Sequence, residues 1–203
     1  MTRTLPWLLL VLAMSCGVSA QMNEVDASVE DAGLPDAGSP DAGRPDAGAP
    51  ELTSAAFVDD GTFPVRYTCA DPTTAGRVSI PLAWSAIPGA RSYSVVMTDT
   101  SIDLIHWVLW DIGEATLALD EGIANVARPP TPAGANQTTS YDGVTFGYRG
   151  PCPPSTHRYR FVLSGLDVVA LPQVTTSSTR AQVQTAISAH VVGSIELIGN
   201  YGP

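Results

Sequence analysis

Residues 147–161 read GYRGPCPPSTHRYRF, and the interpretation of the whole chain starts from this stretch. Its first half is a turn of glycine and proline, in which proline stiffens the backbone and glycine allows a ligand to approach the backbone N–H groups. Its second half alternates aromatic or aliphatic residues with polar ones, which predicts a strand. The side chains that can donate hydrogen bonds to an anion are Arg149, His157, Arg158 and Tyr159. Taken alone, the pattern fits a solvated loop better than a binding site. Whether these residues form a binding site therefore depends on the other parts of the chain.

Residues 1–20 are predicted to be an export signal. A positive Arg3 precedes a short apolar run, and small residues end at Ala20. The apolar run is too short to span a bilayer. Cleavage after Ala20 would release a free protein, whereas cleavage in an imperfect lipoprotein box would leave Cys16 as a lipidated N-terminus. The long spacer that follows favours the lipoprotein. With either cleavage site, the sequence predicts a bacterial protein of the periplasm, the outer membrane or the medium. Its only predicted membrane contact is a lipid anchor.

Residues 21–51 are predicted to be a disordered tether. Asp-Ala-Gly recurs there, preceded by proline in its last three copies, and such a segment has almost nothing to bury. The tether holds a large share of the formal net charge of −10. From residue 52 onward, eight arginines face twelve acidic residues, and the chain has no lysine. Without a concentrated basic surface, the sequence does not predict nucleic-acid binding.

Residues 52–203 are long enough for one domain with its own core. This part contains two cysteines, Cys69 and Cys152. In an oxidising compartment two such cysteines often form a disulfide, and two separate buried thiols are the alternative. The residues alone leave both readings open.

The pattern of the domain is mainly β. Short β-branched or aromatic runs, separated by turn dipeptides such as Asp142-Gly143, predict a sandwich of antiparallel sheets. The predicted strands are residues 65–69, 79–84, 92–98, 105–112, 144–148, 158–166 and 195–201. One helix is predicted over residues 178–190, with Ser177 or Ser178 as its cap, Val191 in its apolar stripe and Gly193 at its end.

Three titratable groups lie in apolar surroundings. Asp99 follows an apolar strand, His106 interrupts a fully apolar run, and His157 opens the strand after the glycine-proline turn. A single histidine in a strand is usually a core residue, and a single aspartate at a strand end usually forms a turn. Three such groups in one domain nevertheless suggest a shared pocket.

From residue 52 to residue 201, the chain resembles the phosphatidylethanolamine-binding, or Raf kinase inhibitor-like, proteins, in particular their bacterial branch. The motifs that carry the resemblance occur in the same order along the chain. They are FPVRYTC at 63–69, PLAW at 81–84, MTD at 97–99, HWVL at 106–109, GAN at 134–136, YRGPCPP at 148–154, THRY at 156–159 and ELIGNY at 196–201. The combination of the HWVL, GPCPP and HRY motifs is specific.

The resemblance implies a Greek-key antiparallel β-sandwich flanked by a few helices, with a small anion pocket at one edge. The pocket side chains that it implies are Asp99, His106, His157 and Tyr159. It also implies a pocket rim at Gly150 and Pro151, with Trp84 on a neighbouring segment. The family pocket accepts phosphoryl groups, such as a phospholipid headgroup or a phosphorylated side chain.

The chemistry of these residues agrees with that expectation. Histidines, a tyrosine and loop amides can supply the several donors that a phosphate needs. A carboxylate beside a histidine favours the imidazolium form and fixes its tautomer, although it also repels a dianion. We therefore expect binding to strengthen below the pH at which His106 and His157 deprotonate.

One segment departs from the family pattern. The family usually continues Asp-Pro-Asp-Ala-Pro, whereas this chain has Asp99-Thr100-Ser101-Ile102-Asp103. Proline would preset a tight turn at the pocket rim. Its absence, in a segment that also looks short, predicts a rim of different shape that is more open on this side.

The residues are compatible with three functions. The sequence favours a non-enzymatic binding protein for small anionic or phosphorylated ligands, without a cofactor. The alternative is an inhibitor or interaction module, for which a protease is the most sensible partner of an exported protein. A hydrolase or metal enzyme built on Asp99, His106 and His157 is disfavoured, because the chain has no Gly-x-Ser-x-Gly, His-Glu-x-x-His or Cys-x-x-Cys motif.

Overall fold

The computed structural model describes residues 49–203. The predicted export signal, Cys16 and most of the predicted tether lie outside these residues. The elements of the described part are β1 (Leu52–Thr53), β2 (Gly61–Thr62), a 3-10 helix η1 (Val65–Tyr67), β3 (Leu82–Trp84), β4 (Ser92–Asp99), β5 (Leu104–Gly113), β6 (Ala118–Leu119), β7 (Asn136–Gln137), β8 (His157–Leu166), α1 (Arg180–Ser188) and β9 (Val191–Tyr201). In this part of the chain, no helix is long and apolar enough to cross a bilayer.

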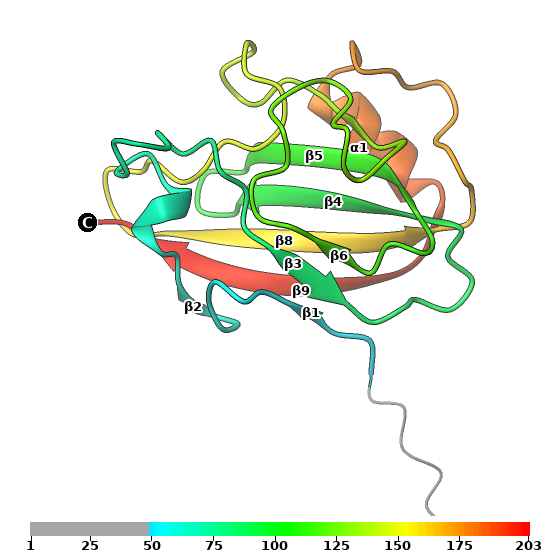
Figure 1. Cartoon of the computed structure of the whole chain (residues 1–203), viewed down its shortest axis with the longest axis horizontal. Helices are drawn as coiled ribbons and strands as arrows, with labels where there is room; N and C mark the ends of the chain where they lie inside the picture. Colours follow the sequence, from blue (N-terminus) through cyan, green and yellow to red (C-terminus); the bar gives the residue numbers. More distant parts are fainter. Residues whose placement is uncertain (1–48) are drawn as a thin grey trace, which may run out of the picture. The chain divides into compact units, whose positions relative to one another are not determined.

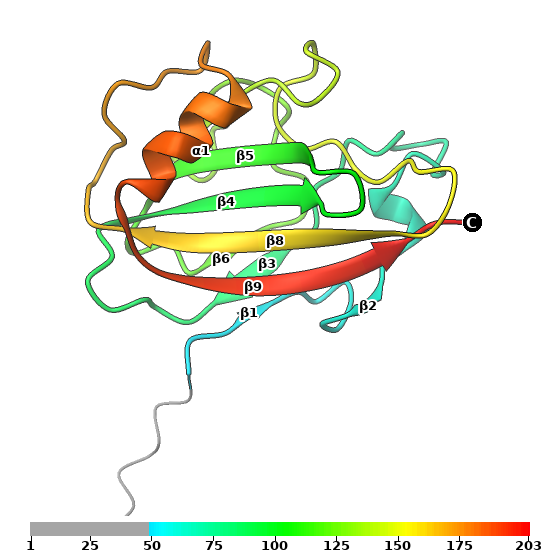
Figure 2. The same ribbon diagram turned by 180° about the vertical axis from the view of Figure 1, so that it is seen from behind.

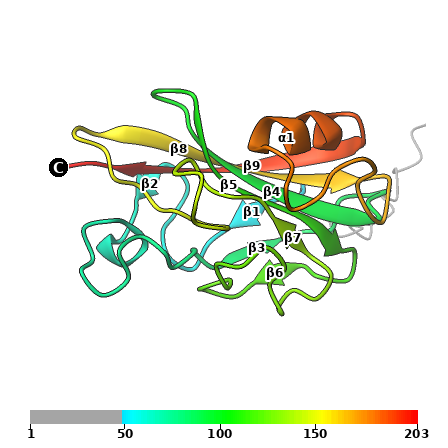
Figure 3. The same ribbon diagram turned by 90° about the horizontal axis from the view of Figure 1, so that it is seen from above.

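Two sheets and one helix form three layers. The larger sheet has six strands in the order β2-β9-β8-β4-β5-β7, and the smaller sheet has the order β1-β3-β6. All pairs are antiparallel except β2 with β9. Viewed from above, the small sheet lies on one face of the large sheet and α1 lies on the other (Figure 3). The expected mainly β sandwich is confirmed, with one α-helix in the described part instead of several.

The alternation of side chains along β4 explains this layering. Val95 and Met97 point into the main core between the sheets, whereas Val96 belongs to a second core with Val183 and Ile187 of α1. All eight residues of β4 are buried, and the run Val95-Val96-Met97 supplies apolar side chains to both faces of the strand. Figures 1 and 2 show β4 near the middle of the large sheet, with α1 covering β4 and β5 from behind.

Four of the predicted strands match long or central strands of the structure. These four are β3, β4, β5 and β8. A fifth predicted strand, β9, is also present, but it begins at Val191, four residues earlier than expected. Val191 and Gly193 therefore belong to a strand and not to the end of the helix. Thr179 caps α1 instead of Ser177 or Ser178, because its hydroxyl accepts from the Gln182 amide and the Gln182 side chain bonds back to it.

Two predicted strands are wrong. Residues 65–69 form η1 and a turn, because the amides of Tyr67 and Thr68 bond to carbonyls three residues earlier. Residues 144–148 form a loop, because the Asp142 carboxylate accepts hydrogen bonds from the amides of Val144 and Thr145 and folds the chain back. In both places, local hydrogen bonds outweigh the β-propensity of the valines and aromatic residues.

Candidate functional site

The inward-facing residues at one end of the large sheet form the candidate site. Asp99, the last residue of β4, lies opposite Tyr159 of β8. Tyr159 shares the core face of the sheet with Phe161 and Leu163. His157 lies two residues before Tyr159, so strand alternation directs it to the same face. The strand register therefore brings together three of the four predicted pocket side chains.

A β-bulge brings in the fourth side chain. Met97 of β4 pairs with Trp107 of β5, and Thr98 pairs with Ile105, so His106 has no partner on β4. Strict alternation would turn His106 to the α1 side with Val108. The extra residue changes the direction of the side chain. The His106 ring instead packs edge-on against the Tyr159 ring, with the ring centroids 5.4 Å apart.

A cavity of about 140 Å³ lies among these four residues. Its lining consists of Asp99, Ile102, Leu104, His106, Tyr141, Cys152, Pro153, Pro154, His157 and Tyr159. Asp99, His106 and Tyr159 are buried, and the His157 side chain is 13% exposed. The cavity thus has a buried polar interior bordered by proline and aliphatic side chains, and it is large enough for a group the size of a phosphate.

Hydrogen bonds fix the orientation of both histidines. Nδ1 of His106 lies 2.8 Å from the carbonyl oxygen of Arg149, which can only accept. Nδ1 of His157 lies 2.6 Å from Oδ2 of Asp99. Nδ1 is therefore the donor in each ring, which leaves Nε2 as the remaining ring nitrogen.

Burial shifts the pKa of two pocket groups. It lowers the pKa of His106, and the bond to Arg149 and the charge of Asp99 only partly oppose this shift. Burial also raises the pKa of Tyr159, and the nearby Asp99 raises it further. At neutral pH, His106 is therefore a neutral imidazole and Tyr159 keeps its hydrogen.

Gly150 and Pro151 lie next to the cavity but are not among the residues that line it. A Cβ on Gly150 would stand 1.9 Å from the carbonyl oxygen of Tyr67, so only glycine fits there. The Pro151 carbonyl accepts a hydrogen bond from the Cys69 amide. These two residues hold the pocket loop against residues 67–76, and Pro153 and Pro154 supply the rim. Trp84 lies in the core against Tyr93, away from the cavity lining.

Cys69 and Cys152 form a disulfide, with Cα atoms 5.3 Å apart. Of the two readings of these cysteines, the structure has the paired one. Because Cys152 lines the cavity, the disulfide connects one cavity wall to the segment after η1. The disulfide from Cys69 to Cys152 and the hydrogen bond from the Cys69 amide to the Pro151 carbonyl both attach this wall to the segment after η1.

Tyr141 also lines the cavity and was not predicted from the sequence. Its ring packs on His106 with centroids 4.6 Å apart, and its oxygen accepts a hydrogen bond from Nε of Arg149 at 3.2 Å. Arg149 in turn pairs with Asp142 at 2.9 Å. Burial opposes ionisation of Asp142, but bonds from Val144 and Thr145 and the charge of Arg149 bring its pKa to about 2. An aromatic residue directly before the Asp142-Gly143 turn was the available signal.

The rim segment 99–103, which departs from the family pattern, is held in its turn by hydrogen bonds instead of by proline. The Ser101 amide donates to Oδ1 of Asp99, and the Ser101 hydroxyl accepts from the Arg158 amide. Thr100 bonds to the Arg158 carbonyl through both its amide and its hydroxyl. Ile102 is left at the mouth of the cavity with 58% of its surface exposed.

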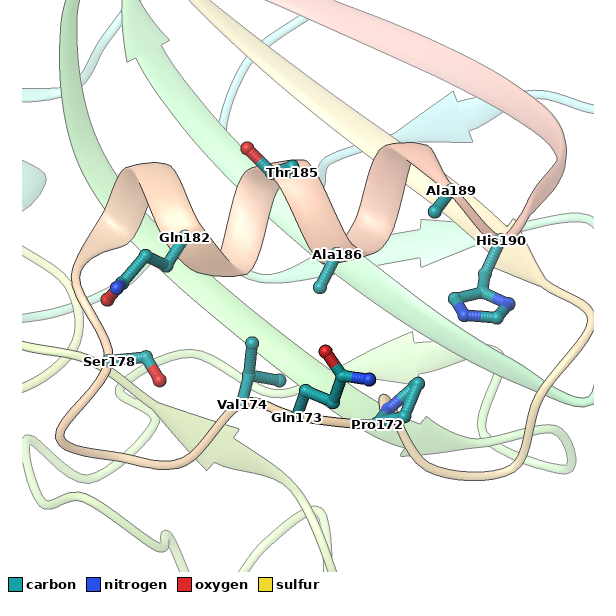
Figure 4. A pocket seen from close by; sticks show the side chains of 9 residues that line it. All are labelled: Pro172, Gln173, Val174, Ser178, Gln182, Thr185, Ala186, Ala189 and His190. Carbon is teal, nitrogen blue, oxygen red and sulfur yellow. The ribbon is translucent and has the colours of Figure 1, made fainter.

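A larger cavity of about 470 Å³ lies between α1 and residues 172–178 (Figure 4). Its lining is neutral and polar or aliphatic apart from His190, whose Nδ1 is bound to Asp167 at 2.8 Å. Gln182 on its wall is already engaged in the cap of α1. This cavity lacks the buried cluster of carboxylate, imidazoles and phenols that the smaller cavity has.

Comparison with known proteins agrees with this fold. The model of the phosphatidylethanolamine-binding protein family matches residues 53–202, and the chain belongs to this family. A UPF0098 protein of Methanothermobacter thermautotrophicus is 37% identical over 155 residues, which cover 74% of this chain and 97% of that protein. A UPF0098 protein of Chlamydia pneumoniae is 35% identical over 161 residues, which cover 74% of this chain and 97% of that protein.

Two solved structures have the same fold. The phosphatidylethanolamine-binding protein homologue CT736 of Chlamydia trachomatis matches with a TM-score of 0.62 and 29% identity. YbcL of E. coli, described as a member of the mammalian family, matches with a TM-score of 0.67 and 24% identity. Each match covers 76% of this chain and 98% of the other. The likeness to YbcL supports the fold alone.

Proposed function

We propose that the protein binds small anionic ligands, phosphorylated ones above all, in the cavity between Asp99, His106, His157 and Tyr159. The observation that carries the proposal is the orientation of the two imidazoles, whose Nδ1 atoms are both engaged in the surrounding structure. Phenol hydroxyls from Tyr159 and Tyr141 stand beside them in the lining. Several directed polar groups in a small, mostly buried cavity are what recognition of an oxyanion requires.

We further propose that binding, and not turnover, is the role of the cavity. The sulfur of Cys152 is held in the disulfide, so this lining residue has no free thiolate to act as a nucleophile. Within residues 49–203, no group of three His, Cys, Asp or Glu side chains has the geometry to hold a metal ion. Phosphorus NMR after long incubation should find phosphoethanolamine unchanged, and release of inorganic phosphate would contradict this role.

Calorimetric titration of the full-length protein with phosphoethanolamine and with inorganic phosphate tests the binding proposal. We expect saturable binding to the wild type and a loss of at least about tenfold in His157→Ala, since a hydrogen bond to a charged group is removed. His190→Ala is the matched control, because His190 lines the other cavity. Absence of saturable binding, or loss of binding in the His190 variant alone, would overturn the proposal.

We also propose that the protein works outside the cytoplasm. The Cys69–Cys152 disulfide supports this location, because disulfides persist mainly in oxidising compartments. Mass spectrometry of the protein from its native host should find an N-terminus at lipidated Cys16 or at Gln21. A mature chain that still begins at Met1 would contradict export.

A further inference from the structure

We propose that the cavity selects a monoanionic oxyanion that still carries a hydrogen, such as dihydrogen phosphate or a hydrogen phosphate ester, over a fully deprotonated dianion. The inference rests on the proposed function and specifies the protonation state of its ligand. It follows from the numbers of donors, acceptors and charges that the structure places around the cavity.

Both histidines present an acceptor to the cavity when they are neutral. The carbonyl oxygen of Arg149 and the carboxylate of Asp99 both accept, so each imidazole places its Nδ1 hydrogen outside the cavity's binding space. In a neutral imidazole the second nitrogen then carries a lone pair and accepts. Nε2 is therefore an acceptor unless the ring gains a proton. Such a group matches a P–OH hydrogen and not a bare oxygen anion.

The lining of the cavity carries little positive charge. Among the described residues that line the cavity, the ionisable groups are the Asp99 carboxylate, two imidazoles and two phenols, and none is an arginine. The guanidinium groups that act on His106 are engaged elsewhere, and that of Arg158 pairs with Asp60 at 2.9 Å. Arg149 pairs with Asp142 and bonds to Tyr141, and Arg180 of α1 donates to the carbonyls of Thr139 and Ser140.

A dianion would consequently meet a carboxylate without a full counter-charge. Burial disfavours the charged form of His106, and any imidazolium at His157 is balanced by Asp99 at 2.6 Å. A dianion in this space would repel Asp99, since electrostatic interactions are strong where water is largely excluded. A monoanion halves that repulsion.

A protonated oxyanion complements the remaining groups. Its hydrogen can be donated to an Nε2 atom, and another of its oxygens can accept from the hydroxyl of Tyr141, whose oxygen already accepts from Arg149. The Tyr159 hydroxyl faces Asp99. Phosphomonoesters lose their second proton at a pKa of about 6, so both of their forms are accessible near neutral pH. Sulfate has a similar shape but remains a dianion without a hydrogen throughout this range.

Comparing phosphate with sulfate separates this mechanism from a simple charging of the histidines. We would titrate the full-length protein with inorganic phosphate, sulfate and dimethyl phosphate at matched ionic strength, at about pH 5.5 and about pH 7.5. Phosphate should bind more tightly at the lower pH and should exceed sulfate there by about tenfold or more. Dimethyl phosphate, which has one charge and no hydrogen, should fall between them.

The Asp99→Asn variant tests directly whether the carboxylate of Asp99 causes the selectivity. It removes the negative charge, and it replaces a carboxylate that can only accept from Nδ1 of His157 by an amide that can accept or donate. Its preference for phosphate over sulfate should shrink by about tenfold, whereas Asp103→Asn, a change of equal charge at an exposed residue outside the lining, should keep the wild-type ratio.

The outcomes distinguish this inference from the function on which it rests. Sulfate that binds wild type as tightly as phosphate at the lower pH would overturn the selectivity but leave anion binding intact. Phosphate that binds more tightly at the higher pH would do the same. No saturable binding of phosphate, dimethyl phosphate or phosphoethanolamine would overturn both.

Discussion

Nδ1 of His106 donates to the carbonyl oxygen of Arg149 at 2.8 Å, and this bond ties the bulge of β5 to the pocket loop. Through the same residue, the loop also fixes Tyr141, because Nε of Arg149 donates to the Tyr141 oxygen. One arginine therefore positions two neighbouring cavity residues, one through its backbone and one through its side chain.

The first prediction concerns stability at acid pH. Burial lowers the pKa of His106 from 6.5, so the unfolded chain binds a proton more readily than the folded protein does. The stability that comes from keeping this ring neutral is present above the unfolded pKa of about 6.5 and is lost as the pH falls below it, at up to about 1.4 kcal/mol per pH unit. His106→Gln should flatten this part of the pH dependence of the free energy of unfolding.

Urea unfolding at several pH values between about 5 and 7 measures this effect. Glutamine can still donate to the Arg149 carbonyl, so the variant is expected to fold. Val144→Ala, at an exposed loop position, is the control and should keep the wild-type slope. An unchanged slope in His106→Gln would show that His106 does not cause the acid sensitivity.

Tyr141→Phe should weaken phosphate binding by about two- to tenfold, because one neutral hydrogen-bond donor of the cavity is lost while the ring stays on His106. Tyr67→Phe is a matched control, since its hydroxyl bonds to Glu121 outside the cavity. Calorimetry gives both affinities. Equal affinities in the two variants would remove Tyr141 from the binding site.

Gly199→Ala should destabilise the protein by about 1–3 kcal/mol. A Cβ at this position would lie 2.3 Å from the ring of Phe63, which packs edge-on against Tyr159. Displacing that ring should also weaken ligand binding. Gly113→Ala places its methyl group in open space and should change stability by less than about 1 kcal/mol. Similar urea midpoints for the two variants would contradict this packing.

Removing the disulfide should lower the free energy of unfolding by about 4 kcal/mol, because the crosslink closes a loop with a sequence separation of 83. The double variant Cys69→Ser, Cys152→Ser should also bind phosphate less tightly, since Cys152 forms part of the cavity wall. Unfolding with and without reductant measures the first effect in the wild type. Identical midpoints would mean that the crosslink contributes nothing to stability.

Much of the site could be predicted from the sequence because strand periodicity carries it. Asp99 ends an apolar strand, and His157 and Tyr159 are two residues apart on another, so their common face follows from alternation. The resemblance to a known family then brought these residues together with His106. The long central strands were predicted for the same reason, since burial on both faces leaves an apolar signature.

The rest depends on interactions that are not local in the sequence. The bulge that redirects His106 arises from the pairing of β5 with β4, and the sequence of β5 alone does not show it. Tyr141 reaches the cavity because Asp142 folds its loop back and Arg149 holds its oxygen. Gly150 looked like a residue of the rim, but its lack of a side chain serves contact with Tyr67 instead.

The central claim is that ligands bind in the smaller cavity, and the histidine ring resonances test it most directly. The chain has three histidines. His106 and His157 line the smaller cavity, whereas His190 lines the larger one. In an NMR titration of the full-length protein with phosphoethanolamine, we expect the first two rings to shift along one saturating curve while His190 stays in place. A saturating shift of His190 alone, or no shift of His106 and His157, would contradict the account.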